Sequence, residues 1–96
     1  MSKHVVKIER VLDMESSRNL KGELVYLLES GVREVELDFS LTESVDSSGL
    51  GKLLLFNEKF REAGGSMKVI NVSNQDLAEM FQLLNLDKLI AIQYIN

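Results

Sequence analysis

At Glu43-Ser44-Val45-Asp46-Ser47-Ser48-Gly49-Leu50-Gly51-Lys52, near the middle of the chain, an alternating strand pattern gives way to a helical one. A short corner of this kind between a strand and a helix is typical of α/β folds. A Ser side-chain oxygen at such a corner can accept a hydrogen bond from the free N–H groups of the first helical turn. The hydroxyl of Ser47 therefore has two candidate roles, as a helix cap or as the site of a switch, and the corner alone does not decide between them.

The segments on either side of the corner have different periodicities. Residues 34–39 alternate strictly between acidic and apolar side chains, which predicts a strand with one face in water. Residues 48–63 carry apolar side chains at helical spacing, and Gly64-Gly65 ends the predicted helix. We expect one face of this helix to be buried, and its members are Leu50, Leu53, Leu54, Asn57 and Phe60, with Phe56 on the flank. Leu55 falls on the opposite side, among charged residues.

The remainder of the chain continues this alternation. We predict further strands at residues 4–10, 67–72 and 89–95, and further helices at 17–30 and 73–84. Gly31 and Asn85 stand where helices end in a left-handed residue, and Ser73 with Asp76 approximates a capping box. The buried stripe of the last helix should contain Leu77, Met80, Phe81 and Leu84.

The element order β-α-β-α-β-α-β predicts an α/β fold. Alternation of this kind implies a mostly parallel, or mixed, sheet of about four strands with three to four helices. The chain has 96 residues, of which 45% are hydrophobic and 27% charged, the balance of one ordinary globular domain over residues 1–96.

Composition argues against several classes of function. The formal net charge of −4 disfavours binding to a phosphate backbone, which depends on Lys and Arg, so we expect no nucleic acid partner. The absence of Cys rules out disulfides and thiolate metal sites and fits a reducing compartment, so we expect a cytoplasmic location. No apolar window is long enough for a signal peptide or a membrane span, so we expect no membrane insertion.

The sequence of the corner does not match the known catalytic and nucleotide-binding motifs. A Ser nucleophile needs a base, usually His, and the single His of the chain is His4, at the start of the first predicted strand. A Walker loop would need Gly in place of Asp46 and Ser or Thr in place of Leu53, and a dinucleotide fingerprint would need Gly or Ala in place of Leu54. No cluster has metal-ligand spacing. We therefore expect no catalytic residue, no cofactor and no metal.

After these exclusions, the remaining candidate function of the corner is to be covalently modified. A Ser on an exposed helix N-terminus is accessible to a kinase, and its phosphate would add about −1.5 to −2 charges. Because helix N-termini favour anions, the phosphate should not unfold the domain. Beside Asp46, on a surface docked against another protein, the added charge would favour dissociation.

The corner resembles the signature of the STAS domain, specifically of the bacterial anti-sigma factor antagonists. The resemblance rests on Asp46-Ser47-Ser48-Gly49-Leu50-Gly51, with strand 35–40 before it and residues 52–55 after it, and it continues through 62–69 and 81–86. It covers roughly residues 13–95. In that family the first Ser after the Asp is phosphorylated by a partner anti-sigma factor that is itself a Ser/Thr kinase. The resemblance thus implies phosphorylation of Ser47, with Ser48 as a less favoured second site.

The resemblance also implies a cycle of partners. The unphosphorylated form would bind the kinase and free its sigma factor, the phosphorylated form would dissociate, and a PP2C-type phosphatase would reset it. The protein would then be the substrate of an enzyme and not an enzyme. We expect partner contacts at Asp46, Ser47, Ser48, Gly49, Leu50, Lys52 and Leu55. The alternative for Leu55 is an isolated exposed leucine, which is common on protein surfaces.

The chain departs from the family pattern in two places, and these leave other functions open. The family commonly opens with a hairpin ending in Gly-Glu-Leu-Asp, where this chain has Arg10-Val11-Leu12-Asp13, and position 44 is Ser instead of a large apolar residue. The main alternative is a STAS subunit that binds without switching, in a lipid transporter or a signalling scaffold. A small nucleotide-binding module is a third class, which a calorimetric titration with GTP or ATP would test.

Overall fold

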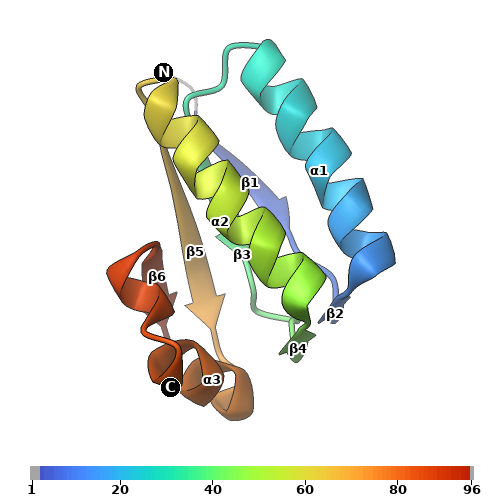
Figure 1. Cartoon of the computed structure of the whole chain (residues 1–96), viewed down its shortest axis with the longest axis vertical. Helices are drawn as coiled ribbons and strands as arrows, with labels where there is room; N and C mark the ends of the chain where they lie inside the picture. The colour runs from blue at the N-terminus through green and yellow to red at the C-terminus, as the bar shows by residue number, and fades with distance from the viewer. Residues whose placement is uncertain (1–2, 96) are drawn as a thin grey trace.

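Four parallel strands form the main sheet of the structure, a computed structural model that describes residues 3–95 (Figure 1). They are β1 (Lys3–Lys7), β3 (Glu34–Asp38), β5 (Ser66–Val72) and β6 (Ala91–Tyr94), in the spatial order β1-β3-β5-β6. Each neighbouring pair is parallel, which confirms the predicted sheet. Of the predicted domain, residues 1, 2 and 96 lie outside the described part.

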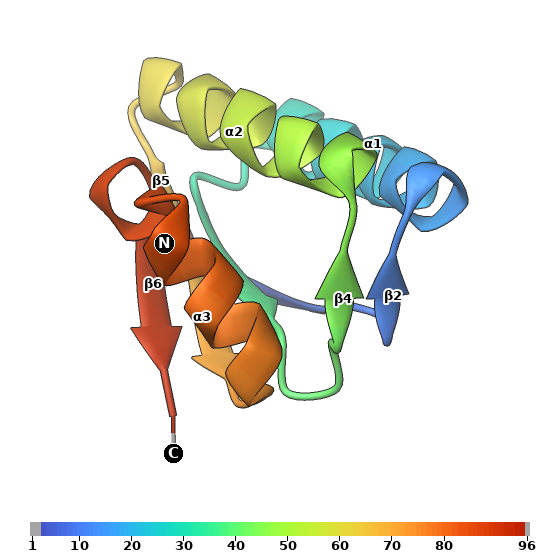
Figure 2. The same ribbon diagram turned by 60° about the horizontal axis from the view of Figure 1, so that its bottom comes forward.

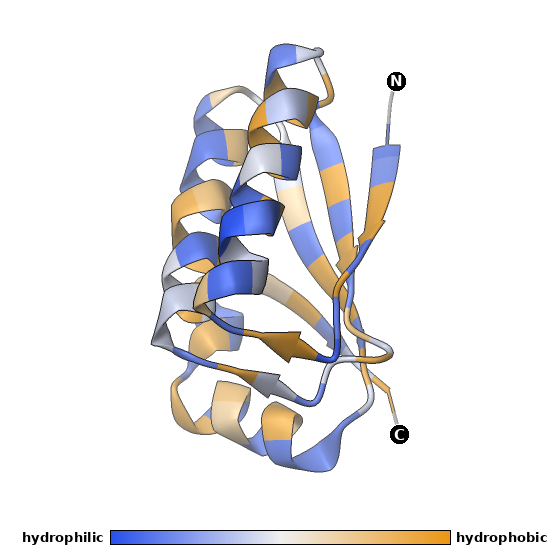
Figure 3. Cartoon of the chain, turned by 90° about the vertical axis from the view of Figure 1, so that its right-hand side faces the viewer, coloured by the Kyte–Doolittle hydropathy of each residue, from blue (hydrophilic) through white to orange (hydrophobic). Residues whose placement is uncertain are grey.

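The helices lie on one side of this sheet (Figures 1 and 3). Helices α1 (Met14–Glu29) and α2 (Ser47–Glu62) run side by side, and α3 (Gln75–Leu83) with the short 3-10 helix η1 (Leu86–Lys88) packs near β5 and β6. Side chains alternate along the strands, so that Val35, Leu37 and Phe39 are buried beneath the helices. The other face of the sheet carries charged residues, including an ion pair of 3.2 Å between Lys3 and Glu36.

The core confirms the predicted apolar pattern of α2, but the buried face is rotated about the helix axis relative to the predicted one. Leu53, Phe56 and Phe60 are fully buried, so that Phe56 lies within the buried face and not on its flank. Leu50 and Asn57 are half-buried. The prediction that Leu54 is buried is wrong, because 40% of its surface is exposed. A helical wheel of 100° per residue defines the centre of the buried face only to within about one residue position. The way in which α2 lies on the sheet therefore decides which of these side chains are buried.

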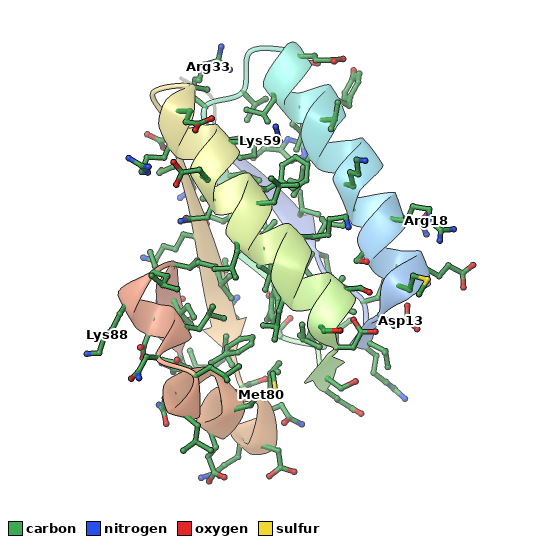
Figure 4. The ribbon with its side chains drawn as sticks, in the orientation of Figure 1. Asp13, Arg18, Arg33, Lys59, Met80 and Lys88 are labelled. Atoms are coloured by element: carbon green, nitrogen blue, oxygen red, sulfur yellow. The ribbon has the colours of Figure 1, made fainter. Side chains whose placement is uncertain are left out.

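The last helix also differs from its predicted stripe. Leu77 and Phe81 are buried, and the Phe81 ring packs against Phe39 with centroids 6.1 Å apart. Met80 is half-buried and packs against the core (Figure 4), whereas Leu84 is 52% exposed. Leu84 lies one residue beyond the last residue of α3, at the point where the chain turns away from the sheet.

Two helix starts differ from the predictions, because Asp13 caps α1 and because Asn74, and not Ser73, caps α3. Helix α1 begins three residues earlier than predicted, and the Asp13 carboxylate accepts a hydrogen bond of 3.1 Å from the Ser16 N–H. In α3, the Asn74 side chain accepts from the Leu77 N–H, while the Ser73 hydroxyl donates to the Ser40 carbonyl in the loop that follows β3. The predicted helix ends are confirmed, since Gly31 and Asn85 both have positive φ angles, of 92° and 54°.

A polar cluster closes the carboxyl ends of the central strands. Asp38 accepts hydrogen bonds from the Ser40 N–H at 2.9 Å and from the Asn71 amide at 3.2 Å, and Lys7 lies 3.8 Å away. Burial alone would raise the pKa of Asp38, but these hydrogen bonds outweigh it, so the pKa lies below its ordinary value. Asn71 adopts a positive φ of 59° at an irregularity in the β5–β6 pairing, which aims its side chain at this carboxylate.

Candidate functional site

A second, two-stranded sheet brings the starts of two helices together. It consists of β2 (Val11–Leu12) and β4 (Ser44–Val45), which pair in parallel and lead directly into α1 and α2 (Figure 2). Because Leu12 is in register with Val45, the next residues, Asp13 and Asp46, follow the two strands side by side. The Asp46 N–H donates to the Leu12 carbonyl at 3.0 Å, which extends the pairing to the helix start. Figure 4 shows Asp13 at this end of the molecule.

Asp46 caps α2, and this settles the first candidate role of the corner. Its carboxylate accepts a hydrogen bond of 2.9 Å from the Gly49 N–H, while its own carbonyl accepts from the Leu50 N–H. The interpretation of Ser47 as a helix-capping hydroxyl is therefore wrong. Ser47 is the first residue of α2, it is exposed, and its hydroxyl has no hydrogen-bond partner among residues 3–95.

Gly49 is present at the corner because the two helix starts approach each other closely. A Cβ atom built on Gly49 would lie 2.8 Å from the Leu12 carbonyl oxygen and 2.9 Å from Cγ1 of Val45. No larger residue fits without moving backbone atoms of β2. Gly49 is buried, so its role in the structure is to pack β2 and β4 against the first turn of α2.

The remaining predicted contact residues differ in exposure. Ser48, Leu50 and Lys52 are half-buried, and Leu55 is 43% exposed on the outer side of α2. Leu54 is exposed as well, although the sequence pattern placed it in the core. The structure thus presents two adjacent leucines, two turns from Ser47, on a helix face that looks away from the sheet.

The surroundings of Ser47 are acidic. Asp13 lies beside Asp46 across the β2–β4 pair, and hydrogen bonds from the N–H and the hydroxyl of Ser16 lower the pKa of Asp13, so it is ionised at neutral pH. Glu43 at the same end forms an ion pair of 3.7 Å with Arg10. The sequence pattern did not predict that Asp13 would be a neighbour of Asp46. The available signal was that both residues directly follow a short apolar segment and precede a helix.

The corner does not bring together an acid–base site. His4 lies on β1 level with Val35 and Met67, at the end of the sheet where α2 terminates and not where it begins. Among the described residues, no group of three His, Cys, Asp or Glu side chains is placed to hold a metal ion. Within residues 3–95, no helix has the length and apolar character needed to cross a membrane.

Comparison with known families identifies the fold. The family model described as "Mlab, STAS domain" matches residues 2–92, nearly the whole chain. The chain belongs to the STAS domain family. A comparison with curated proteins gave no significant match.

Solved structures show the same STAS fold. A proposed anti-sigma factor antagonist from Thermotoga maritima superposes with a TM-score of 0.75 at 24% identity, covering 100% of this chain and 76% of the other. The anti-sigma factor antagonist SpoIIAA in its unphosphorylated form gives a TM-score of 0.70 at 17% identity, covering 96% of this chain and 77% of the other. The phosphorylated form of SpoIIAA, described as a Bacillus cell fate determinant, gives 0.72 at 18% identity, with 96% and 81% covered. These similarities place the Ser47 corner within a STAS fold.

Proposed function

We propose that this STAS domain is an anti-sigma factor antagonist controlled by phosphorylation of Ser47. The unphosphorylated form binds a Ser/Thr-kinase anti-sigma factor in the cytoplasm and frees the sigma factor, and the phosphorylated form is released. One observation carries the proposal: the Ser47 hydroxyl is exposed and unbonded within the described residues, while Asp46 performs the capping. Similarity to structures of SpoIIAA in both phosphorylation states supports it.

The helix start can accept a phosphate without losing its own hydrogen bonds. The N–H groups of Ser47 and Ser48 lie in the first turn of α2, where no intrahelical carbonyl is available to them. A phosphate on Ser47 therefore meets free donors and the positive end of the helix. The Asp46 cap is formed by another side chain, so modification of Ser47 leaves it in place.

The same phosphate should weaken the complex. It adds about −1.5 to −2 charges beside Asp46 and Asp13, within a surface that is already acidic. The partner is itself the kinase, so the phosphates of its nucleotide lie close to Ser47 during transfer, and the two anionic groups repel each other. The added group must also lose its water when the surfaces are in contact. Release follows from these effects without any change of fold, and a PP2C-type phosphatase restores the binding form.

Incubation with the purified kinase partner and ATP tests the proposal. We expect one phosphate per chain, on Ser47, detected by mass spectrometry of the intact protein and its peptides. Ser47→Ala should accept no phosphate and still bind, and Ser47→Asp should bind more weakly. Ser48→Ala is the matched control and should behave as the wild type. Phosphate recovered from Ser47→Ala at the wild-type level contradicts the site assignment.

A STAS subunit that binds constitutively is the second candidate. The matching family model is described as "Mlab, STAS domain", and this description names neither an antagonist nor a phosphorylation site. Such a subunit, in a lipid transporter or a signalling scaffold, would use the same corner as a permanent contact. Stable binding to a partner that never transfers phosphate to Ser47 would support this candidate over the first. Transporter genes beside the gene for this chain would point the same way.

A further inference from the structure

The outer edge of β1 has no neighbouring strand within the described part of the chain. β1 is the first strand in the order β1-β3-β5-β6, and it pairs only with β3. Just after β1, the Ile8 N–H donates to the Asp38 carbonyl at 2.9 Å, so the backbone groups of Ile8 point to β3. Because these groups alternate in direction along a strand, the N–H and C=O groups of Lys3, Val5 and Lys7 point outward. The edge therefore presents a row of backbone donors and acceptors that β3 does not use.

Helix α1 leaves room beside this edge. Figure 1 shows α1 on the outer side of β1, and two adjoining hollows, of about 50 and 410 Å³, lie between the helix and the strand segment. Both hollows are lined by Glu9, which follows β1, and by Ser16 and Asn19 of α1. The smaller one also borders Val6 and Ile8, so it follows the course of the strand. The position of one further strand is thus open at this edge of the sheet.

The edge lacks the usual protection against pairing with another chain. Proteins guard exposed strands with Pro, with bulges or with charged side chains at the edge. The chain contains no Pro, and the β1–β3 register is regular. Lys3 and Lys7 lean toward the neighbouring strand, where they lie 3.2 Å and 3.8 Å from the carboxylates of Glu36 and Asp38. Between them, Val5 is 51% exposed, so the side chains of β1 leave its edge accessible.

The charges along this edge are complementary to those of a second copy of the chain. Two copies related by a two-fold axis can pair their β1 strands antiparallel, with outward-pointing residues opposite each other. With the axis at Val6, Lys3 faces Glu9 of the second copy, so opposite charges meet at both ends of the pair. With the axis at Val5, Lys3 would face Lys7 of the second copy, and like charges directly opposite each other are destabilising. The sequence of the edge therefore favours the first of these registers.

We infer that β1 is the contact through which two copies of this chain form a dimer, with their sheets joined across an antiparallel β1–β1 pair. Backbone hydrogen bonds supply the attraction, and the two Lys3–Glu9 contacts set the register. The inference does not rest on the proposed function, because Ser47 belongs to α2, which forms no part of this edge.

Amide hydrogen exchange of the full chain, followed by NMR at increasing protein concentration, tests the contact residue by residue. The Val5 N–H should exchange freely at tens of micromolar and become protected at millimolar concentration, while sedimentation equilibrium shows monomer converting to dimer. The Val6 N–H points to β3, so it is the internal control and should be protected throughout. A Val5 N–H that stays unprotected at every concentration overturns the inference. Protection of this N–H in the monomer also overturns it, because the chain would then cover its own edge.

Two variants and a matched control test the register. Glu9→Lys should weaken the dimer by about fivefold or more, because both Lys3–Glu9 contacts become repulsive. Glu79→Lys changes the net charge equally on an exposed position of α3, which packs near β5, so this control should dimerise at least as strongly as the wild type. Val5→Pro removes an N–H that β3 does not use, so it should fold and remain monomeric. A dimer that is weakened equally by Glu9→Lys and Glu79→Lys, or that persists in a folded Val5→Pro variant, overturns the inference.

Discussion

Replacing Gly49 with Ala should destabilise the domain, although alanine is the better helix former. The new Cβ would lie 2.8 Å from the Leu12 carbonyl oxygen and 2.9 Å from both Cγ of Leu12 and Cγ1 of Val45. The carbonyl cannot simply move away, because it also accepts the 3.0 Å hydrogen bond from the Asp46 N–H. Alanine at this position therefore forces β2 and the first turn of α2 apart.

The magnitude follows from two opposing effects. Overpacking of this kind costs about 1–3 kcal/mol, and strain on the Asp46 hydrogen bond adds to it. The gain in helix propensity from Gly to Ala returns about 1 kcal/mol. With the hydrogen-bond strain included, the net loss should be about 1–2 kcal/mol, which in a domain of this size lowers the melting temperature by about 4–16 °C.

Urea denaturation followed by circular dichroism measures this loss. Gly51→Ala in the same helix is the control, since its open surroundings should let alanine stabilise the protein by up to about 1 kcal/mol. The two substitutions are chemically identical and should shift the midpoint in opposite directions. If Gly49→Ala is as stable as the wild type, the close approach of the two helix starts is not as described, and the account of the corner fails.

Three further predictions concern the helix cap, acid stability and a second close approach. Asp46→Ala should lower the free energy of unfolding by about 1 kcal/mol through loss of the cap, whereas Ser47→Ala should change it by less than about 0.5 kcal/mol; equal losses in urea titrations would return the capping role to Ser47. The pKa of Asp38 is lowered from 3.8 in the folded state, so its contribution to stability is present above about pH 4 and is lost as the pH falls further; Asp38→Asn should flatten the stability curve between about pH 5 and 3, and an unchanged slope would contradict this. Gly65→Ala should prevent normal folding, because its Cβ would lie 1.8 Å from the Arg33 carbonyl oxygen; a soluble variant with the wild-type melting temperature would contradict it.

The main elements could be predicted from the sequence because their patterns are long and strongly periodic. Residues 34–39 alternate over six positions, and α2 spans more than four turns, so a shift of one residue does not change the assignment. The strands β2 and β4 contain two residues each, too few for any period to be detected. Their pairing depends on contacts between residues more than thirty positions apart, which the local sequence does not encode.

The candidate site was predicted in part. The signature residues pointed to Ser47, but several residue types can cap a helix, so the sequence could not decide between Asp46 and Ser47 as the cap. Leu54 and Leu55 were predicted on opposite sides of α2, and the structure exposes both, because the rotation of the helix on the sheet is set by Phe56 and Phe60 beneath it. The different surroundings of the two signature glycines could not be predicted, since only the packing of the folded chain shows that Gly49 is crowded and Gly51 is open.

Phosphopeptide mapping of the protein purified from its own cell tests the central claim most directly. The switching account predicts a phosphate on Ser47 in a fraction of the molecules, and a fraction that changes with the conditions under which the sigma factor is active. A protein that carries no phosphate at Ser47 under any growth condition, or that carries it at another residue, would contradict the account.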